Sequence, residues 1–123
     1  MMKKYFLMMV MLFTMSMGLF AEDNNVNEVQ RTEMYDVKVN MKNLSRFLEL
    51  SKDQVEPVST IEEEFSRDLM FAAVECNDKN RLTVTQNAIN KNIKYMSYVL
   101  NKKQYQKYLK VLNMTISNRG LLK

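Results

Sequence analysis

The chain has 123 residues, a formal net charge of +4, no histidine, no tryptophan and one cysteine. The lack of histidine excludes Ser-His-Asp and Cys-His catalysis and histidine-ligated zinc or haem. A single cysteine cannot form a disulfide within the chain, and the near absence of glycine and proline favours long helices with short links.

The first segment, residues 1–21, has the pattern of a signal peptide. Lys3 and Lys4 are followed by an apolar run at residues 5–20 and by the small residue Ala21. We predict cleavage after Ala21. An uncleaved anchor is the alternative, because the run is at the short end of a membrane span. In either case we expect a periplasmic or otherwise exported protein that contacts the membrane only through this segment.

The residues after the signal peptide divide into a leader and one domain. Residues 22–33 are polar, and we predict a flexible leader. Residues 34–123 are predicted to form a single helical domain. Apolar residues recur at helical spacing over 34–48, but residues 35–39 alternate as in a strand. The first helix of the domain is therefore placed near Asn40.

A five-residue pattern occurs twice, as Leu-Ser-Lys-Asp-Gln at 50–54 and as Leu-Asn-Lys-Lys-Gln at 100–104. In each copy a residue suited to an N-cap precedes a glutamine by three positions, which is the spacing of a capping box. The flanking hydrophobes have the spacing of a hydrophobic staple. Two helices are thus predicted to begin with the same structural device, formed by Leu50, Ser51, Gln54, Val55, Leu100, Asn101, Gln104 and Tyr105.

The second helix of the domain is predicted to run from the Ser51 cap to about Cys76. Pro57 lies past its first turn and should either bend or split it, and the sequence leaves both possibilities open. Cys76 falls on the apolar stripe, seven residues after Leu69, so a buried thiol is expected. Pairing with a cysteine of another chain is the alternative.

A polar break at 77–80 precedes the third helix, for which Asp78 is a candidate cap, and Gly120 is placed to end the fourth helix in a left-handed conformation. The expected fold is all-α, with about four helices forming two related helical hairpins after a cleaved signal peptide. The predicted apolar stripes are Leu82, Ile89, Ile93, Met96 and Leu100 on the third helix, and Tyr105, Leu109, Leu112 and Ile116 on the fourth.

Charge is divided between the two halves of the chain. Residues 22–75 carry 13 acidic and 6 basic side chains, whereas residues 76–123 carry 1 acidic and 10 basic side chains. Mutual neutralisation within the fold is one interpretation. Two displayed surfaces of opposite sign, or a head-to-tail dimer, is the other.

An acidic cluster on the second helix raises the question of a cation site. Glu62, Glu63 and Glu64 point in different directions on a helix, and only Glu64 and Asp68 share a face. A calcium site needs six or more oxygen ligands. We therefore expect a solvated surface here, with no metal and no other cofactor.

Lysines and tyrosines are interleaved near the end of the third helix and along the fourth. Such a surface could bind nucleic acid, but the signal peptide argues against that partner. An anionic envelope surface or an acidic stretch of an unfolded client protein fits better, and simple solubility is the alternative. The candidate partner surface consists of Lys94, Tyr95, Tyr98, Lys102, Lys103, Lys107, Tyr108 and Lys110.

The doubled Leu-Ser/Asn-x-x-Gln pattern resembles the Leu-Thr-x-x-Gln motif of the Spy/CpxP family, small exported all-helical proteins of the Gram-negative periplasm. Ser51 and Asn101 stand in place of the family's threonine and keep its capping role. The resemblance implies a helical hairpin that dimerises and holds unfolded proteins without ATP. Residues 101–121 are also similar to small exported proteins of Bacteroides-like bacteria, which implies location and helical fold only.

We therefore expect a non-enzymatic exported protein that binds unfolded or stressed envelope proteins. The alternative is a structural or regulatory protein that binds one specific envelope partner or self-associates, for example as a homodimer. An enzyme is not expected, because the chain has no obvious acid–base pair.

Overall fold

The structure is a computed structural model that describes residues 27–122. The predicted signal peptide, residues 1–21, and the first part of the predicted leader lie outside the described residues. All regular elements within the described range are helices, so the predicted all-α fold is confirmed. These helices are α2 (Glu28–Tyr35), α3 (Met41–Leu48), α4 (Lys52–Val74), α5 (Asp78–Val99) and α6 (Lys102–Arg119).

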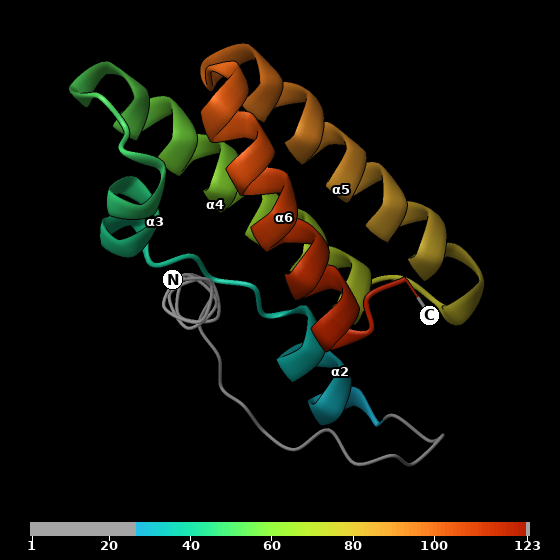
Figure 1. Cartoon of the computed structure of the whole chain (residues 1–123). Helices are drawn as coiled ribbons and strands as arrows, with labels where there is room; N and C mark the ends of the chain where they lie inside the picture. Colours follow the sequence, from blue (N-terminus) through green and yellow to red (C-terminus); the bar gives the residue numbers. More distant parts are fainter. Residues whose placement is uncertain (1–26, 123) are drawn as a thin grey trace.

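Three long helices, α4, α5 and α6, lie side by side and form most of the structure (Figure 1). The most extensive contact is between α4 and α5, which follow each other through a short turn. The short helix α3 packs against α4 and α6, and α2 packs against α4. The two related halves are α3–α4 and α5–α6. They share the order of helix, link and capped helix, but α3 has 8 residues whereas α5 has 22.

Part of the predicted flexible leader is a helix. α2 begins after Asn27, whose side-chain oxygen accepts from the Gln30 backbone N–H at 2.8 Å, while Gln30 Oε1 accepts from the Asn27 N–H at 3.2 Å. This capping box supplies two of the hydrogen bonds that a helix start lacks. At the other end, Arg119 Nη1 donates to the Glu33 carbonyl oxygen at 2.9 Å and so ties α2 to the end of α6.

The structure answers two questions that the sequence raised about α4 and the link after it. Pro57 lies inside α4, which runs unbroken from Lys52 to Val74, so proline does not split this helix. Cys76 was predicted on a buried helical stripe. It lies instead in the link after α4 and is half-buried, because the helix ends before reaching it.

The helices α3 and α6 end in the same backbone motif. The Leu50 N–H donates to the Ser45 carbonyl oxygen at 3.0 Å, and the Leu121 N–H donates to the Ile116 carbonyl oxygen at 3.1 Å. Both ends need a left-handed residue. Gly120, as predicted, fills this position in α6, but Glu49 fills it in α3 with φ 55°. A residue with a Cβ atom is therefore held in a conformation that favours glycine.

The hydrophobic core lies between the long helices, but its faces differ from the predicted stripes. Leu82 is exposed, and Ile93, Tyr105, Leu109 and Ile116 are only partly buried. The fully enclosed positions include polar residues, and the buried polar or charged side chains of the described range are Glu62, Thr85, Asn92, Gln104, Thr115 and Arg119.

Candidate functional site

The two copies of the repeated motif meet in space through their glutamines. Gln54 Nε2 donates to Gln104 Oε1 at 2.8 Å, and Gln104 Nε2 donates back to Gln54 Oε1 at 3.0 Å. Each Oε1 also accepts from the backbone N–H of its own cap residue, Ser51 or Asn101, at 2.9 Å. We call this reciprocal pair, Gln54 with Gln104, the glutamine clasp.

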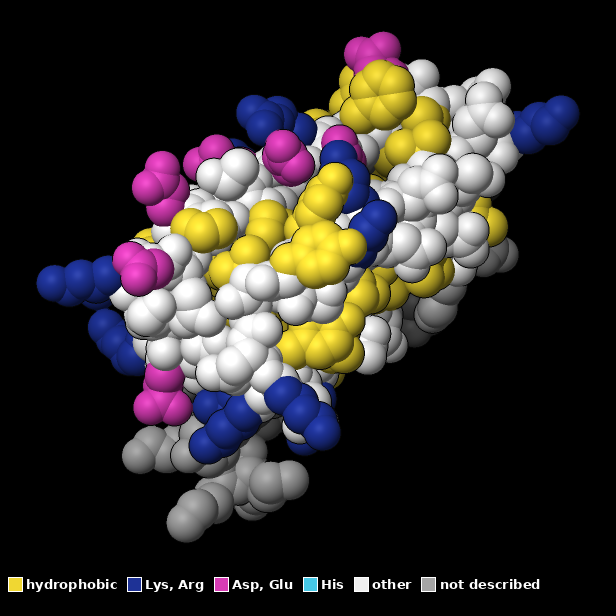
Figure 2. All heavy atoms as spheres, turned by 90° about the horizontal axis from the view of Figure 1, so that it is seen from above, with side chains coloured by type: hydrophobic (Ala, Val, Ile, Leu, Met, Phe, Trp, Pro, Cys, Tyr) yellow, Lys and Arg dark blue, Asp and Glu magenta, His cyan; other side chains and the backbone are white. Residues whose placement is uncertain are grey.

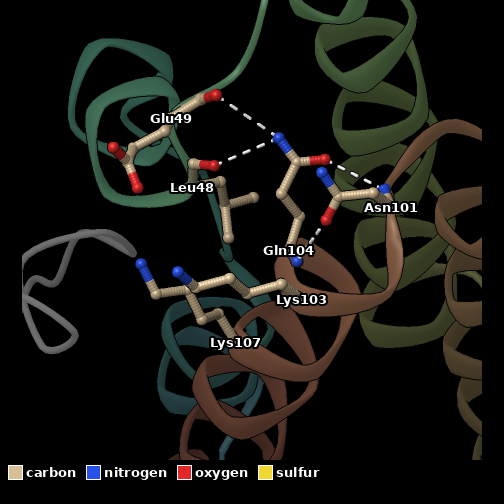
Figure 3. A pocket seen from close by; sticks show the side chains of 6 residues that line it. All are labelled: Leu48, Glu49, Asn101, Lys103, Gln104 and Lys107. Atoms are coloured by element: carbon tan, nitrogen blue, oxygen red, sulfur yellow. Dashed lines mark hydrogen bonds between the residues drawn. The ribbon is translucent and has the colours of Figure 1, made fainter.

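The clasp also binds the backbone that precedes each helix. Gln54 Nε2 donates to the Val99 carbonyl oxygen at 3.0 Å, and Gln104 Nε2 donates to the Glu49 carbonyl oxygen at 3.3 Å. Val99 and Glu49 occupy equivalent positions, each five residues before its glutamine. Gln104 Nε2 also reaches the Leu48 carbonyl oxygen at 3.1 Å, and Figure 3 shows the amide directed at both carbonyl groups. The two halves are therefore joined by a nearly symmetric set of hydrogen bonds.

The predicted capping boxes are present at both α4 and α6. Leu100 and Gln104 are buried, and Leu50, Gln54 and Tyr105 are partly buried. Val55 is the exception among the hydrophobes of the motif, because 36% of its surface is exposed. Capping explains why each helix carries the motif, and the contact between the glutamines explains why the two copies occur together.

A cavity of about 220 Å³ lies beside the clasp, between the end of α3 and the start of α6. Lys103 and Lys107 extend next to each other along one side of it (Figure 3). Lys107 Nζ donates to the Phe47 carbonyl oxygen at 3.1 Å and lies 5.0 Å from the centre of the Phe47 ring. Its ammonium group thus holds α6 against α3, which limits its role in binding a partner.

The candidate partner surface divides into two rows, and one of its members is not on the surface. Tyr95 and Tyr98 lie on α5 with ring centres 6.3 Å apart. Lys94 is four residues before Tyr98 and therefore lies on the same face of the helix. The α6 lysines at 103, 107 and 110 form the second row. Lys102 is exposed on α6 as well. Tyr108 was predicted to belong to this surface, but it is completely buried in the core.

Apolar side chains are exposed in several places on the described surface. Tyr98 is 70% exposed and Tyr95 is 40% exposed. Phe71 and Val74, three residues apart at the end of α4, are also exposed. Figure 2 shows one face of the molecule, on which hydrophobic side chains gather centrally with lysine, arginine and acidic side chains around them. Apolar surface surrounded by charged side chains is typical of protein-binding sites.

Contacts within the described residues neutralise part of the divided charge, and Arg119, for example, is attracted to the charge of Asp36. One ion pair joins α4 to α5, between Lys91 Nζ and Asp68 Oδ2 at 2.9 Å. Asp78 forms two further ion pairs, with Arg31 and Arg81. None of the five α5 and α6 lysines of the candidate partner surface takes part in an ion pair with a described acidic group. The geometry therefore favours displayed charge over mutual neutralisation.

A buried polar triangle links the three long helices, and the sequence interpretation missed it. It consists of Glu62 from α4, Asn92 from α5 and Tyr108 from α6. Asn92 Nδ2 donates to Glu62 Oε1 at 3.0 Å, and the Tyr108 hydroxyl oxygen lies 2.6 Å from Glu62 Oε1 and 2.5 Å from Asn92 Oδ1. Burial raises the pKa of Glu62 to about 7, against hydrogen bonds from Tyr108 and Asn92 that lower it.

The same burial, together with the charge of Glu62, raises the pKa of Tyr108 well above its ordinary value, so its hydroxyl keeps its proton. Glu62 was expected on a solvated surface with its acidic neighbours. The signal that could have placed it inside is its position four residues after Val58 and three before Phe65, on the buried face of α4.

Neither a metal centre nor a membrane-spanning helix is found between residues 27 and 122. In this range no group of three or more histidine, cysteine, aspartate or glutamate side chains could hold a metal ion. None of the helices there combines the length and the apolar character needed to cross a bilayer. Comparisons of the chain with protein-family models, curated proteins and solved structures found no match.

Proposed function

We propose that this chain is an exported, non-enzymatic protein that binds unfolded or stressed envelope proteins. The observation that carries the proposal is the Tyr95–Tyr98 pair, exposed on α5 beside Lys94, a cation with no ion pair among the described residues. Aromatic side chains bind apolar segments of varied sequence, and nearby lysines attract acidic segments. Such a surface suits client proteins that have apolar and acidic segments in common but differ in folded shape.

Export is the second part of the proposal and rests on the sequence alone. The basic and apolar pattern of residues 1–21 favours a signal peptide, and the doubled motif resembles that of the Spy/CpxP family. The hydrogen bonds of the glutamine clasp bring the two motif copies into direct contact, which supports treating them as one structural pair. Since the motif residues bind one another, we propose that the exposed tyrosines of α5 and the exposed lysines are the residues that bind a partner.

The direct test is suppression of aggregation, followed by light scattering. Purified protein is added at increasing ratios to two unrelated proteins, one that aggregates on reduction and one that aggregates on heating. We expect scattering from both to fall as the ratio rises. Failure to slow the aggregation of either protein at several-fold excess would contradict the proposal.

A pair of variants tests whether the tyrosine pair is the binding surface. Tyr95→Ser combined with Tyr98→Ser should reduce the suppression at least twofold at equal concentration, because it removes the exposed aromatic surface. Val29→Ser is the matched control, since Val29 on α2 is 67% exposed and Tyr98 is 70% exposed. If the control loses as much activity as the tyrosine variant, the surface has been assigned wrongly.

The displayed charge favours a second candidate function, binding of one specific partner or of a second copy. The acidic side chains of α4 and the lysines of α6 make no ion pair with each other in the described range. A head-to-tail complex would bring such surfaces together and should weaken as salt is raised. Sedimentation at low and high ionic strength tests this, and a strict monomer at both would count against self-association.

A further inference from the structure

Each of the three close contacts in the polar triangle needs a proton between its two atoms. When Glu62 is ionised, Tyr108 and Asn92 together cannot supply all three. The Tyr108 hydroxyl oxygen is 2.6 Å from Glu62 Oε1 and 2.5 Å from Asn92 Oδ1. A tyrosine hydroxyl has one proton, and an amide oxygen only accepts. If Tyr108 donates to Asn92, the contact with Glu62 needs a proton from Glu62. All three contacts then have a proton, because Asn92 Nδ2 supplies the third.

Exchanging the oxygen and nitrogen of the Asn92 amide does not remove this requirement. Tyr108 could then donate to Glu62, but the amide oxygen of Asn92 would face Glu62 Oε1 across the 3.0 Å contact. Two oxygens at that separation again need a proton between them. In either orientation, the triangle closes only when Glu62 is a neutral carboxylic acid.

The surroundings of Glu62 offer no compensation for a negative charge. Tyr108 from α6 and Asn92 from α5 are the groups that hydrogen-bond to it, and Glu62 Oε2 has no hydrogen-bond partner. No lysine or arginine from any described helix, α2 and α3 included, forms an ion pair with it. Its neighbours Glu63 and Glu64 on α4 are acidic and lie nearer the surface. An ionised Glu62 would therefore be a buried charge without a counter-ion.

Of the three helices that meet at the triangle, α6 packs least extensively against the others. Its contacts with α5 and α3 are much less extensive than the contact between α4 and α5. Tyr108 is the residue that brings a buried polar atom from α6 to the triangle. We propose that Glu62 is a proton-controlled lock on α6: as a neutral acid it holds Tyr108 against α4 and α5, and loss of its proton lets α6 separate from them.

Separation of α6 would expose apolar side chains that the closed form buries, among them Val111 and Leu112. The lock would thereby regulate the proposed function, with more surface for unfolded proteins as the pH rises. This consequence rests on the proposed function, whereas the lock itself does not. Opening of α6 should become easier as the pH rises from about 4.5 and should level off above about pH 7, since burial brings the pKa of Glu62 to about 7.

The test is amide hydrogen exchange of α6, expressed as protection factors so that intrinsic exchange rates cancel. If Glu62 has its ordinary pKa of 4.5 in the open form and about 7 in the closed form, protection should fall roughly tenfold between pH 6 and pH 8. Glu62→Gln, which cannot ionise, should abolish this fall. Glu63→Gln is the matched control, because Glu63 is exposed on the same helix, and it should behave as the unaltered protein.

Two further measurements keep the proposal testable if Glu62→Gln fails to fold. Carbon-13 NMR of the Glu62 carboxyl group in the unaltered protein should give a pKa well above 4.5. Tyr108→Phe removes the α6 hydroxyl that the neutral acid holds, so the protection of α6 at pH 6 should fall toward its value at pH 8.

A Glu62 pKa near 4.5, protection of α6 that is flat from pH 6 to pH 8, or unchanged protection at pH 6 in Tyr108→Phe would each overturn the proposal. Exchange is measured without any client. Absence of holding activity would therefore contradict the proposed function and leave this result unchanged.

Discussion

At the scale of single residues, the left-handed ends of α3 and α6 provide a comparison within one molecule. Gly120 has φ 66° and Glu49 has φ 55°. Glycine adopts this region without a steric penalty, whereas other L-residues are strained there. Glu49 is exposed, and its backbone carbonyl, not its side chain, binds Gln104. Its side chain can therefore be replaced without loss of the clasp.

Glu49→Gly should raise the free energy of unfolding by up to about 1 kcal/mol, because relief of strain exceeds the entropy that glycine adds to the unfolded chain. Gly120→Ala should have the opposite effect and lower it by about 1 kcal/mol. Urea unfolding of both variants measures these changes. Destabilisation by Glu49→Gly would show that the Glu49 side chain makes a favourable contact that outweighs its backbone strain.

At the scale of helices, Pro57 is the residue that fits least well with the helix in which it lies. It is the sixth residue of α4, so its missing N–H leaves one backbone hydrogen bond unmade inside the helix. Pro57 is exposed, and its replacement leaves the core intact.

Pro57→Ala should raise the free energy of unfolding by about 1–2 kcal/mol, less than the full helix-propensity difference because proline also restricts the unfolded chain. Thr60→Ala, at another exposed position of α4, is the control and should change it by less than about 0.7 kcal/mol. Thermal unfolding compares the two. An unchanged melting temperature in Pro57→Ala would mean that α4 accommodates the proline without cost.

Helix boundaries could be predicted where capping chemistry is explicit in the sequence. Asn40, Ser51, Asn101 and Gly120 each mark the end of a helix as expected. α2 was missed because it is short and polar, although Asn27 and Gln30 have the spacing of a capping box. Local hydrogen bonding thus identifies helix ends better than apolar content does in this chain.

The faces of the helices were harder to predict, because polar residues occupy core positions. Gln104 and Thr115 lie on the buried face of α6 with Tyr108, whereas the apolar pattern selected Tyr105 and Leu109. Gln104 can be buried since its partner, Gln54, is 50 residues away in the sequence. Periodicity of hydrophobic residues does not carry information about such distant partners, so it also missed Glu62.

At the scale of the whole molecule, the buried Glu62 should make stability depend on pH in a definite direction. Below about pH 4.5 both the folded and the unfolded forms hold this proton, and no difference arises. Between about pH 4.5 and 7 the unfolded form loses it while the folded form retains it, so folding becomes less favourable as pH rises. Above about pH 7 both forms are ionised and the effect is constant.

The contribution of Glu62 to the free energy of unfolding should therefore decrease by about 3 kcal/mol from pH 4.5 to above pH 7. Urea unfolding at a series of pH values measures the decrease. Glu62→Gln should lose this slope, and the exposed Glu63→Gln should keep it. An equal slope in both variants would assign the pH dependence to other groups.

The central structural claim is that the two glutamines join the halves of the molecule as a pair. A double-mutant cycle of Gln54→Ala and Gln104→Ala tests it most directly, with Gln106→Ala as the control because Gln106 is exposed two residues away on α6. We expect a coupling energy of at least about 1 kcal/mol for Gln54 with Gln104, and additive effects for Gln54 with Gln106. If the losses for Gln54 and Gln104 add to within about 0.3 kcal/mol, the two motifs act only as separate helix caps and the clasp does not join the halves.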